Sequence, residues 1–301
     1  AYWFGLTACQ ILCGAAVHQA LCSRLVSSQG KKRAIGAAAL LGASSLVVLG
    51  AVVGIAYSLP TPRPSYSFRV GQGTKSVTVD AFLPDGIDAR NLPAVVIFHG
   101  VEGATPLMRL AIHYPNSKAI SAKGVATYFV RYFDASPYDD LMIMKDDALD
   151  TDEIEKVRKD DYRQWIDLAC QSITEVRNRP EVDPDRIAVV GYSLGCYVGT
   201  AATSRLCRDG YPCAIVGNFG SIWPEVEFDQ SFPPIQFHHG EQDPVISVEK
   251  ARQAKDRLLE LGAKEVELFV YPEQGHVPSG PGSYDLRLKT EAFLRDKLDL
   301  P

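Results

Sequence analysis

The sequence predicts an α/β fold, with a mostly parallel sheet of about eight strands and helices on both of its faces. The first observation is that short apolar segments alternate with longer amphipathic ones from about residue 66 to the end. That alternation is typical of a parallel sheet covered by helices. The second is the composition, because 46% hydrophobic and 22% charged residues in 301 indicate a globular protein. Disordered and collagen-like chains are thereby excluded.

The strands are expected where apolar residues alternate or follow one another without interruption. The run Ala94–Phe98 is wholly apolar, as a central strand requires. Asp183–Arg186 is interpreted as a turn that leads into the strand after it. The predicted strands are 76–83, 94–98, 125–130, 187–190, 214–216, 235–238 and 266–271.

Three long helices are expected between these strands and after them. Apolar residues recur at helical spacing from 152 to 179, and Pro180 ends that helix. Ser247 is a suitable N-cap for a helix that ends at Gly262, and residues 286–298 form the terminal helix.

The first 58 residues differ in charge from the rest of the chain. They hold four basic residues and no acidic one, whereas the remainder has 27 Lys and Arg against 36 Asp and Glu. An acidic globular part argues against nucleic-acid binding, because attraction to phosphate dominates that affinity. The basic residues near the start point to a membrane instead.

Residues 34–58 are predicted to form a transmembrane helix or signal anchor. They include 24 consecutive positions without a charge, behind a basic cluster at 31–33, and such a run crosses roughly 30 Å of hydrocarbon. Residues 1–33 supply an uncharged segment, which is a possible first membrane segment, and a basic loop. A proline-rich linker at 59–65 then leads to the globular domain at 66–301, which is expected on the extracytoplasmic side. A cleaved signal and a buried core helix are the alternatives.

A G-x-S-x-G motif follows directly on a predicted strand. Ile187–Gly195 reads IAVVGYSLG, and residues 196–206 are compatible with a helix. Strand, tight turn and helix form the context in which a serine is exposed as a nucleophile at the carboxyl edge of a sheet. Gly191 and Gly195 are expected because side chains beside the serine do not fit such a turn. Ser193 is therefore the candidate nucleophile.

His276 is the candidate base. A serine hydroxyl is a weak nucleophile until a base removes its proton, and His276 lies in a loop after the last predicted strand, free to reach Ser193. The other histidines stand in less suitable places: His18 near the membrane segment, His113 in a predicted helix, and His99, His238 and His239 at strand ends.

Asp243 is the candidate acid that orients the base. It stands just beyond a predicted strand and before a predicted helix. The order Ser193, Asp243, His276 is that of α/β-hydrolases and differs from the chymotrypsin and subtilisin orders. Glu241 and Glu273 are alternative acids and are expected to be solvated.

Two backbone N–H groups are expected to hold the developing oxyanion. One belongs to Leu194, directly after the nucleophile. The other is assigned to Val101 in the loop after the strand 94–98, with Gly100 as the alternative.

The globular part resembles the dienelactone hydrolase family of α/β-hydrolases. The resemblance is carried by VVIFHG at 95–100, DPDRIAVVGYSLG at 183–195, HGEQDP at 239–244 and Gly275-His276. It implies a hydrolase without cofactor or metal that acts on small-molecule esters. This chain departs from the founding members, because it has Ser193 in place of their cysteine and Gly100 in place of their glutamate. A general ester or acyl hydrolase is therefore expected, rather than dienelactone hydrolysis.

The sequence leads to three further expectations, on the pocket, on a cysteine pair and on the alternative functions. Gly100, Tyr132, Phe133 and Tyr192 are expected to line the substrate pocket. Cys207 and Cys213 are close enough in the sequence to pair in an oxidising compartment. A serine peptidase of the prolyl-oligopeptidase type and a non-catalytic, hydrolase-derived binding module are the alternative functions.

Overall fold

The computed structural model describes residues 62–86, 90–135 and 151–301, with only the helical backbone at 151–160. Two compact units are distinguished. One comprises residues 64–105 and 117–301, and the other comprises residues 1–63 and 106–116. The predicted membrane segments at 1–33 and 34–58 lie outside the described residues, as do residues 59–61 of the predicted linker. Within the described ranges, no helix combines the length and apolarity needed to cross a membrane.

The unit of residues 64–105 and 117–301 is built on one sheet of eight strands in the order β1-β2-β4-β3-β5-β6-β7-β8. The pairs β1–β2 and β2–β4 are antiparallel, and all later pairs are parallel. This confirms the predicted mostly parallel sheet. The strands are β1 (Tyr66–Gln72), β2 (Lys75–Phe82), β3 (Leu92–Phe98), β4 (Ala126–Arg131), β5 (Val182–Tyr192), β6 (Ala214–Asn218), β7 (Ile235–Gly240) and β8 (Val266–Tyr271).

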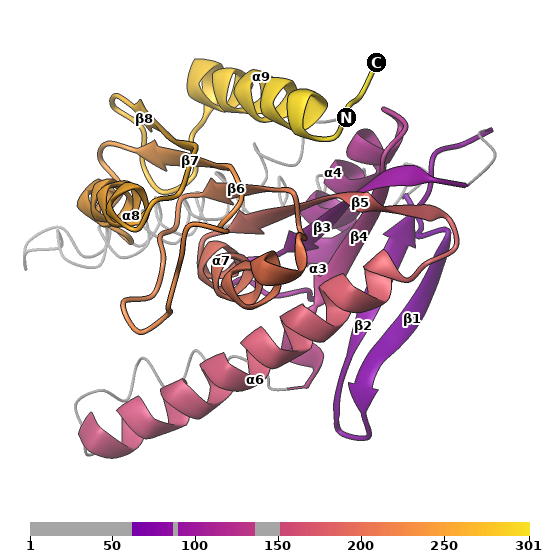
Figure 1. The fold of residues 1–301 in the computed structure, drawn as a ribbon, viewed down its shortest axis with the longest axis horizontal. Coiled ribbons are helices and arrows are strands. Elements are labelled where there is room, and N and C mark those ends of the chain that lie inside the picture. The colour runs from indigo at the N-terminus through magenta and orange to yellow at the C-terminus, as the bar shows by residue number, and fades with distance from the viewer. Residues whose placement is uncertain (1–61, 87–89, 136–150) are drawn as a thin grey trace, which may run out of the picture. The chain divides into compact units, whose positions relative to one another are not determined.

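Long helices cover both faces of this sheet. Figure 1 shows α6 and α7 on one face and α9 on the other. The long helices are α6 (Thr151–Arg177), α7 (Leu194–Leu206), α8 (Val248–Glu260) and α9 (Gly280–Lys297). Shorter helical segments are α3 (Pro106–Met108), the π-helix η1 (Arg109–His113), α4 (Tyr114–Ser121) and the 3₁₀ helices η2 (Tyr132–Asp134) and η3 (Cys207–Asp209).

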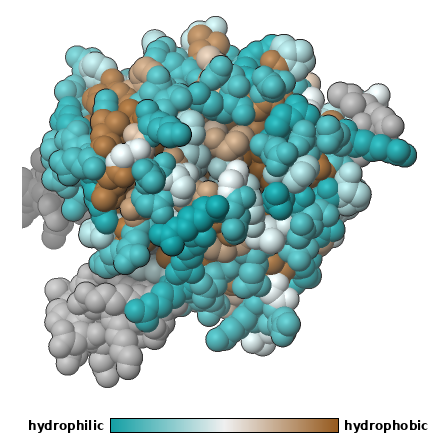
Figure 2. Space-filling view, in the orientation of Figure 1, coloured by the Kyte–Doolittle hydropathy of each residue, from teal (hydrophilic) through white to brown (hydrophobic). Residues whose placement is uncertain are grey.

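The core lies between the sheet and the helices. Every residue of β3 is buried, in agreement with its apolar run, and Trp165 and Ile173 of α6 are buried as well. Burial of such side chains stabilises a fold by about 1.5–3 kcal/mol each. On the face shown in Figure 2, hydrophobic residues form separate groups among hydrophilic ones. The apolar side chains of the helices thus pack mainly into the core.

Two predicted boundaries were wrong. The predicted turn at Asp183–Arg186 lies within the bounds of β5, which begins at Val182 and not at residue 187. The pairing with β3 jumps from Val182 to Ile187, so these four residues form a bulge in the strand. Within it, the Asp185 N–H and the Arg186 guanidinium donate to the Asp183 carboxylate at 3.1 and 2.7 Å, and Arg186 also donates to the Asn91 carbonyl at 2.9 Å. The terminal helix begins at Gly280, six residues before the predicted start, with a proline in its first turn where no N–H partner is needed.

Candidate active site

Ser193 lies in a strained turn between β5 and α7. In the sheet, Phe98 of β3 stands beside Gly191 of β5, and Tyr192 stands beside Asn218 of β6. The turn at Ser193 therefore projects from the carboxyl edge of the sheet between two central neighbours. Ser193 has φ 52° and ψ −118°, a conformation that L-residues rarely adopt and that persists only where the surroundings enforce it.

The glycines two residues before and two residues after Ser193 make that turn possible, because neither has a side chain. A Cβ at Gly191 would lie 2.4 Å from the Gly195 carbonyl oxygen, and a Cβ at Gly195 would lie 2.3 Å from the Phe98 carbonyl oxygen. Both contacts are shorter than any real Cβ contact, and both are with backbone. The sequence expectation that no side chain fits at these positions is thus met by the observed packing.

The loops after β7 and β8 carry Asp243 and His276, and backbone hydrogen bonds join them. The Glu241 N–H donates to the Tyr271 carbonyl, and the Gln242 N–H donates to the Gln274 carbonyl, both at 2.9 Å. Gly240 ends β7 where a Cβ would lie 2.1 Å from the Gly275 carbonyl oxygen. A glycine is therefore required for the two loops to approach.

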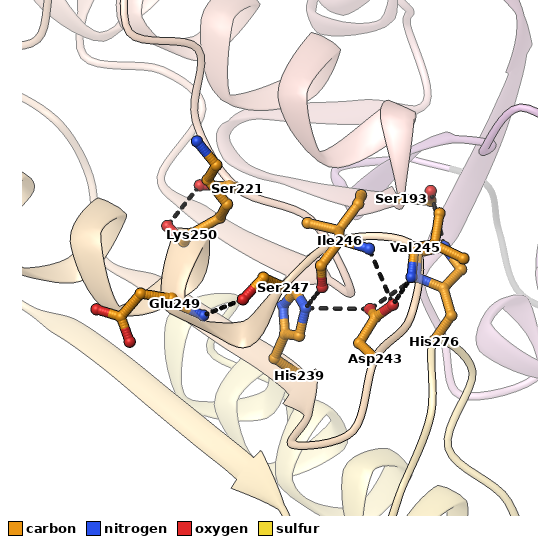
Figure 3. A network of polar contacts seen from close by, with 10 residues as sticks. All are labelled: Ser193, Ser221, His239, Asp243, Val245, Ile246, Ser247, Glu249, Lys250 and His276. Atoms are coloured by element: carbon orange, nitrogen blue, oxygen red, sulfur yellow. Dashed lines mark hydrogen bonds and ion pairs between the residues drawn. The ribbon is translucent and has the colours of Figure 1, made fainter. Parts of the chain in front are cut away.

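The structure brings Ser193, His276 and Asp243 together. The distance from His276 Nε2 to Ser193 Oγ is 3.0 Å, and the distance from His276 Nδ1 to Asp243 Oδ2 is 2.8 Å. Figure 3 shows the three side chains one after another, with His276 between Ser193 and Asp243. Because a carboxylate accepts the Nδ1 proton, Nε2 presents its lone pair to the Ser193 hydroxyl. The arrangement can withdraw a proton from Ser193 and return it to another oxygen.

Asp243 is held in its ionised form. Its side chain is inaccessible to solvent, while that of His276 is 21% exposed. Burial alone would raise the pKa of Asp243. The hydrogen bonds that it accepts from His239, from His276 and from the backbone N–H groups of Ile246 and Val245 outweigh burial and hold that pKa well below its ordinary value. The alternative acids Glu241 and Glu273 are both exposed.

The loop after β3 lies beside the nucleophile. A Cβ at Gly100 would lie 3.1 Å from Ser193 Cβ and 2.4 Å from Glu102 Oε2, so a larger residue there would displace one or the other. The Glu102 carboxylate accepts the Gly100 N–H at 3.1 Å. Desolvation raises the pKa of Glu102, although the N–H groups of Glu102 and Gly100 and the charge of His276 oppose the rise. No pattern in the sequence pointed to Glu102.

Leu194 and Val101 are the predicted oxyanion donors, and they lie directly after the nucleophile and in the loop after β3. Leu194 is buried and is the first residue of α7, so its N–H belongs to the first turn, whose N–H groups have no acceptor within the helix. Val101 lies in the loop after β3 and its residue surface is 44% exposed.

Of the predicted pocket residues, Tyr132 is corrected by the structure. It is fully buried, its hydroxyl donates to the His99 carbonyl at 2.7 Å, and its ring stacks on the His99 ring at 4.2 Å. A residue so enclosed is part of the core and does not line an open pocket. Phe133 is half-buried and contacts Gly103, with its side chain 3.2 Å from the Cβ that a larger residue at 103 would carry.

Phe219 and Tyr192 lie next to each other beside the base. Their ring centroids are 6.1 Å apart, and the Phe219 ring is 5.8 Å from that of His276. Phe219 has a positive φ of 50°, and its N–H donates to the His238 carbonyl at 2.8 Å. Sequence reasoning missed Phe219, because nothing in a lone phenylalanine after a strand signals that conformation.

The cysteines of the described residues are all free. Cys207 Sγ lies 3.2 Å from Ser231 Oγ, whereas Cys213 Sγ donates to the Lys297 carbonyl. The suggested Cys207–Cys213 disulfide is therefore absent from the structure. Cys196 is buried behind the nucleophile, which raises the pKa of its thiol and keeps it protonated. In the same described ranges, His, Cys, Asp and Glu side chains form no group suited to a metal ion.

The model of the dienelactone hydrolase family matches residues 79–292. None of the curated proteins matches the sequence significantly.

Solved structures share the fold at low sequence identity. An α/β-hydrolase enzyme from a Medee basin deep-sea metagenome library has 17% identity and a TM-score of 0.58, over 78% of this chain and 98% of that chain. A dienelactone hydrolase-like promiscuous phosphotriesterase from metagenomic libraries has 16% identity and a TM-score of 0.60, over 77% and 98%. Esterase 2 of Thermogutta terrifontis, solved with propionate bound, has 15% identity and a TM-score of 0.53, over 73% and 89%. At these identities the likeness shows the α/β-hydrolase fold.

The family match covers the sheet from the second half of β2 through β8 and includes the loops that carry Ser193, Asp243 and His276. It spans more than half of the chain. The chain belongs to the dienelactone hydrolase family and is an α/β-hydrolase that acts on ester bonds.

Proposed function

We propose that this protein is a serine hydrolase that cleaves small carboxylic esters through an acyl-enzyme intermediate. The observation that carries the proposal is the continuous chain of hydrogen bonds from Ser193 Oγ through His276 to Asp243, with distances of 3.0 and 2.8 Å. It joins a nucleophile, a base and an orienting acid at one edge of the sheet. The solved esterase with propionate, a short carboxylate, is consistent with ester chemistry on this fold.

In the first half-reaction, Ser193 Oγ attacks the ester carbonyl carbon and its proton passes to His276 Nε2. The carbonyl oxygen becomes an oxyanion, which the N–H groups of Leu194 and Val101 bind. Asp243 is already ionised and stabilises the imidazolium that forms. His276 then protonates the oxygen of the leaving alcohol as its bond to the acyl carbon breaks.

In the second half-reaction, water attacks the acyl-enzyme while His276 accepts a proton from it. The second tetrahedral intermediate collapses, His276 returns a proton to Ser193 Oγ, and the carboxylic acid leaves. The same three side chains serve both halves, so a single defect in the relay slows acylation and deacylation alike.

The test compares the wild-type chain with Ser193→Ala on p-nitrophenyl acetate and butyrate and on aminoacyl-prolyl p-nitroanilides. We expect ester hydrolysis by the wild type and a loss of roughly 10⁶-fold in kcat for the variant, as in other serine hydrolases. Unchanged ester hydrolysis by a folded Ser193→Ala chain would contradict the proposal. Faster cleavage of the prolyl amides than of the esters would favour the peptidase alternative.

We also propose that residues 34–58 tether the enzyme to a membrane with the catalytic domain on the extracytoplasmic side. The support is the uncharged run and the basic residues Lys31, Lys32 and Arg33 before it. A full-length chain is expected to stay with membranes after alkaline carbonate extraction and to be digested by protease added outside intact cells. Release by carbonate would contradict tethering, and protection from the protease would contradict the orientation.

A further inference from the structure

His239 is a buried histidine beside the triad that the proposed reaction does not use. It is the penultimate residue of β7, and its side chain is inaccessible to solvent. Its Nε2 lies 3.1 Å from Asp243 Oδ2 and 2.8 Å from the Ile246 carbonyl oxygen. Figure 3 shows the ring on the side of Asp243 away from Ser193. Asp243 therefore lies between two imidazoles.

The partners of His239 determine which of its nitrogens carries the proton. Both groups that face Nε2, a carboxylate and a carbonyl, are hydrogen-bond acceptors, so Nε2 carries the proton and donates it. Nδ1 is buried and has no hydrogen-bond partner among the described residues. A second proton there would be buried without an acceptor, which is costly. The N–H of His239 is thus at Nε2, where it points at Asp243 and Ile246.

His239 completes the set of donors around the Asp243 carboxylate. Oδ1 accepts the backbone N–H groups of Val245 at 2.8 Å and Ile246 at 3.0 Å. Oδ2 accepts Nδ1–H of His276 and Nε2–H of His239. Each oxygen thus has two donors. Because His239 also binds the Ile246 carbonyl, it ties the loop that supplies the backbone donors to the last turn of β7.

We propose that His239 is a positioning residue, which holds the Asp243 carboxylate toward His276 and shares its negative charge. The inference rests on the proposed serine-hydrolase function. Without the His239 N–H, Oδ2 has only the imidazole of His276 as a side-chain donor, and the carboxylate loses one of the four hydrogen bonds that fix its orientation. Misorientation slows proton transfer at Ser193. At the same time, the negative charge of Asp243 that His239 no longer shares stabilises protonated His276, which cannot act as a base.

Other titratable groups near the relay come from neighbouring elements. Tyr197 of α7 lies within electrostatic range of Asp243, and burial raises the pKa of its hydroxyl, so it stays neutral across the working pH range. Glu102 in the loop after β3 lies within electrostatic range of His276. Both are unchanged in the variants below, so a shift between variants reports the loss of the His239 N–H.

The experiment measures the second-order rate of labelling by a fluorophosphonate, and kcat/KM for p-nitrophenyl butyrate, as functions of pH in the full chain. His239→Met removes the donor at similar volume, and His239→Gln keeps an N–H at the same distance from the backbone. We expect His239→Met to lose roughly 10-fold in kcat with little change in KM, as for one hydrogen bond to a charged group. The acid limb of its pH–rate profile, where the rate falls as the pH is lowered, moves to higher pH by about 0.5 pH unit. His239→Gln recovers most of the rate and the wild-type limb.

His238→Met is the matched control. His238 is the neighbouring residue of β7 and equally buried, but its ring binds the Tyr271 hydroxyl at 2.7 Å and Gln236 Oε1 at 2.8 Å and does not contact Asp243. It is expected to lower thermal stability while its acid limb stays at the wild-type pH. A limb that moves equally in His238→Met and His239→Met would overturn the inference, because general loosening of β7 would then explain both.

Two further outcomes separate this inference from the proposed function. If the wild type is not labelled at Ser193, the proposed function itself fails. If the wild type is labelled and His239→Met shows the same rate and limb, only the role of His239 fails. Proton–nitrogen correlation spectra of wild-type histidines provide a readout that needs no variant. We expect His239 in the Nε2–H tautomer, and the Nδ1–H tautomer would overturn the inference even if the variants do not fold.

Discussion

The nucleophile and its partners are positioned by different forces. Ser193 lies in a tight turn, in which neighbouring backbone atoms leave no room for a Cβ at Gly191 or Gly195. Asp243 and His276 lie on two loops that are joined by hydrogen bonds and by one close approach at Gly240. Substitutions beside the nucleophile are therefore expected to cause steric clashes that destabilise the fold. Substitutions beside the acid and the base are expected to lower kcat before they lower stability.

After the loss of the nucleophile itself, the largest effect on the rate is expected on the acid side. Asp243→Asn keeps the shape of the residue but offers an N–H where the triad needs an acceptor, so His276 adopts the wrong tautomer. The kcat for ester hydrolysis should fall about 10⁴-fold, as in serine proteases, while thermal unfolding shows a folded chain. A loss below tenfold would mean that another group orients His276, with exposed Glu241 and Glu273 as the first to test by substitution.

The same substitution changes the dependence of stability on pH. Because the folded state lowers the pKa of Asp243, its ionised form contributes stability that is present above the ordinary aspartate pKa and is lost as the pH falls toward the lowered value. Wild type is expected to lose more unfolding free energy between about pH 5 and pH 2 than Asp243→Asn. Urea unfolding across that range measures the difference, and parallel curves would contradict the hydrogen-bonding pattern described for Asp243.

The nucleophile side should fail by destabilisation. In Gly195→Ala, the added methyl group would meet the Phe98 carbonyl oxygen at 2.3 Å, so β3 and α7 must move apart. We expect a loss of about 3 kcal/mol in the free energy of unfolding, at the upper end for overpacking, together with lost activity. Gly210→Ala is a suitable control, because no atom lies within 4 Å of its Cβ position, although its φ of 81° carries a strain of its own. Equal stability losses in both variants would show that the contact with Phe98 is unimportant.

Gly240→Ala sharpens the comparison from the other side. The methyl group would meet the Gly275 carbonyl oxygen at 2.1 Å, and we expect the partly exposed loop that carries His276 to move outward in response. A displacement of about 1 Å costs roughly 10²-fold in rate, so kcat should fall by that order while stability falls less than in Gly195→Ala. Thermal unfolding and ester hydrolysis measured on the same samples decide this. If Gly240→Ala is destabilised as strongly as Gly195→Ala, Gly240 belongs with the glycines beside the nucleophile, where a clash affects folding.

The smallest effect is expected at the helix that follows Asp243. Ser247 caps α8, because its hydroxyl oxygen accepts the Glu249 N–H at 3.3 Å. Ser247→Ala should cost about 1 kcal/mol of stability and leave kcat unchanged, since the Ser247 hydroxyl binds the Glu249 N–H and not a triad residue. Ser247→Asp, which keeps a cap, is the control. A fall in kcat for the alanine variant would show that the cap also sets the position of the loop at 243–246.

Much of this site was predictable because its signals are local. The apolar run at 94–98 and the glycines around Ser193 have consequences that depend only on their neighbours in the chain. The order of Ser193, Asp243 and His276 then directed attention to two loops that the structure brings together.

What was not predictable depends on contacts between distant segments. The bulge at Asp183–Arg186 lies inside β5 and is joined to the Asn91 carbonyl, far away in the sequence. Tyr132 at a strand end looked like a pocket residue but is enclosed by His99 and Trp165. His239 was a histidine at a strand end like others, and only the path of the loop at 243–246 brings Asp243 back to its ring.

The central claim is that Ser193 becomes acylated. The most direct measurement is rapid mixing of the full chain with p-nitrophenyl butyrate, followed by acid quenching and mass spectrometry of the intact and digested protein. The account predicts a burst of p-nitrophenol in proportion to enzyme and a butyryl group on the peptide that contains Ser193. Steady turnover by a chain whose Ser193 peptide never gains mass would contradict it.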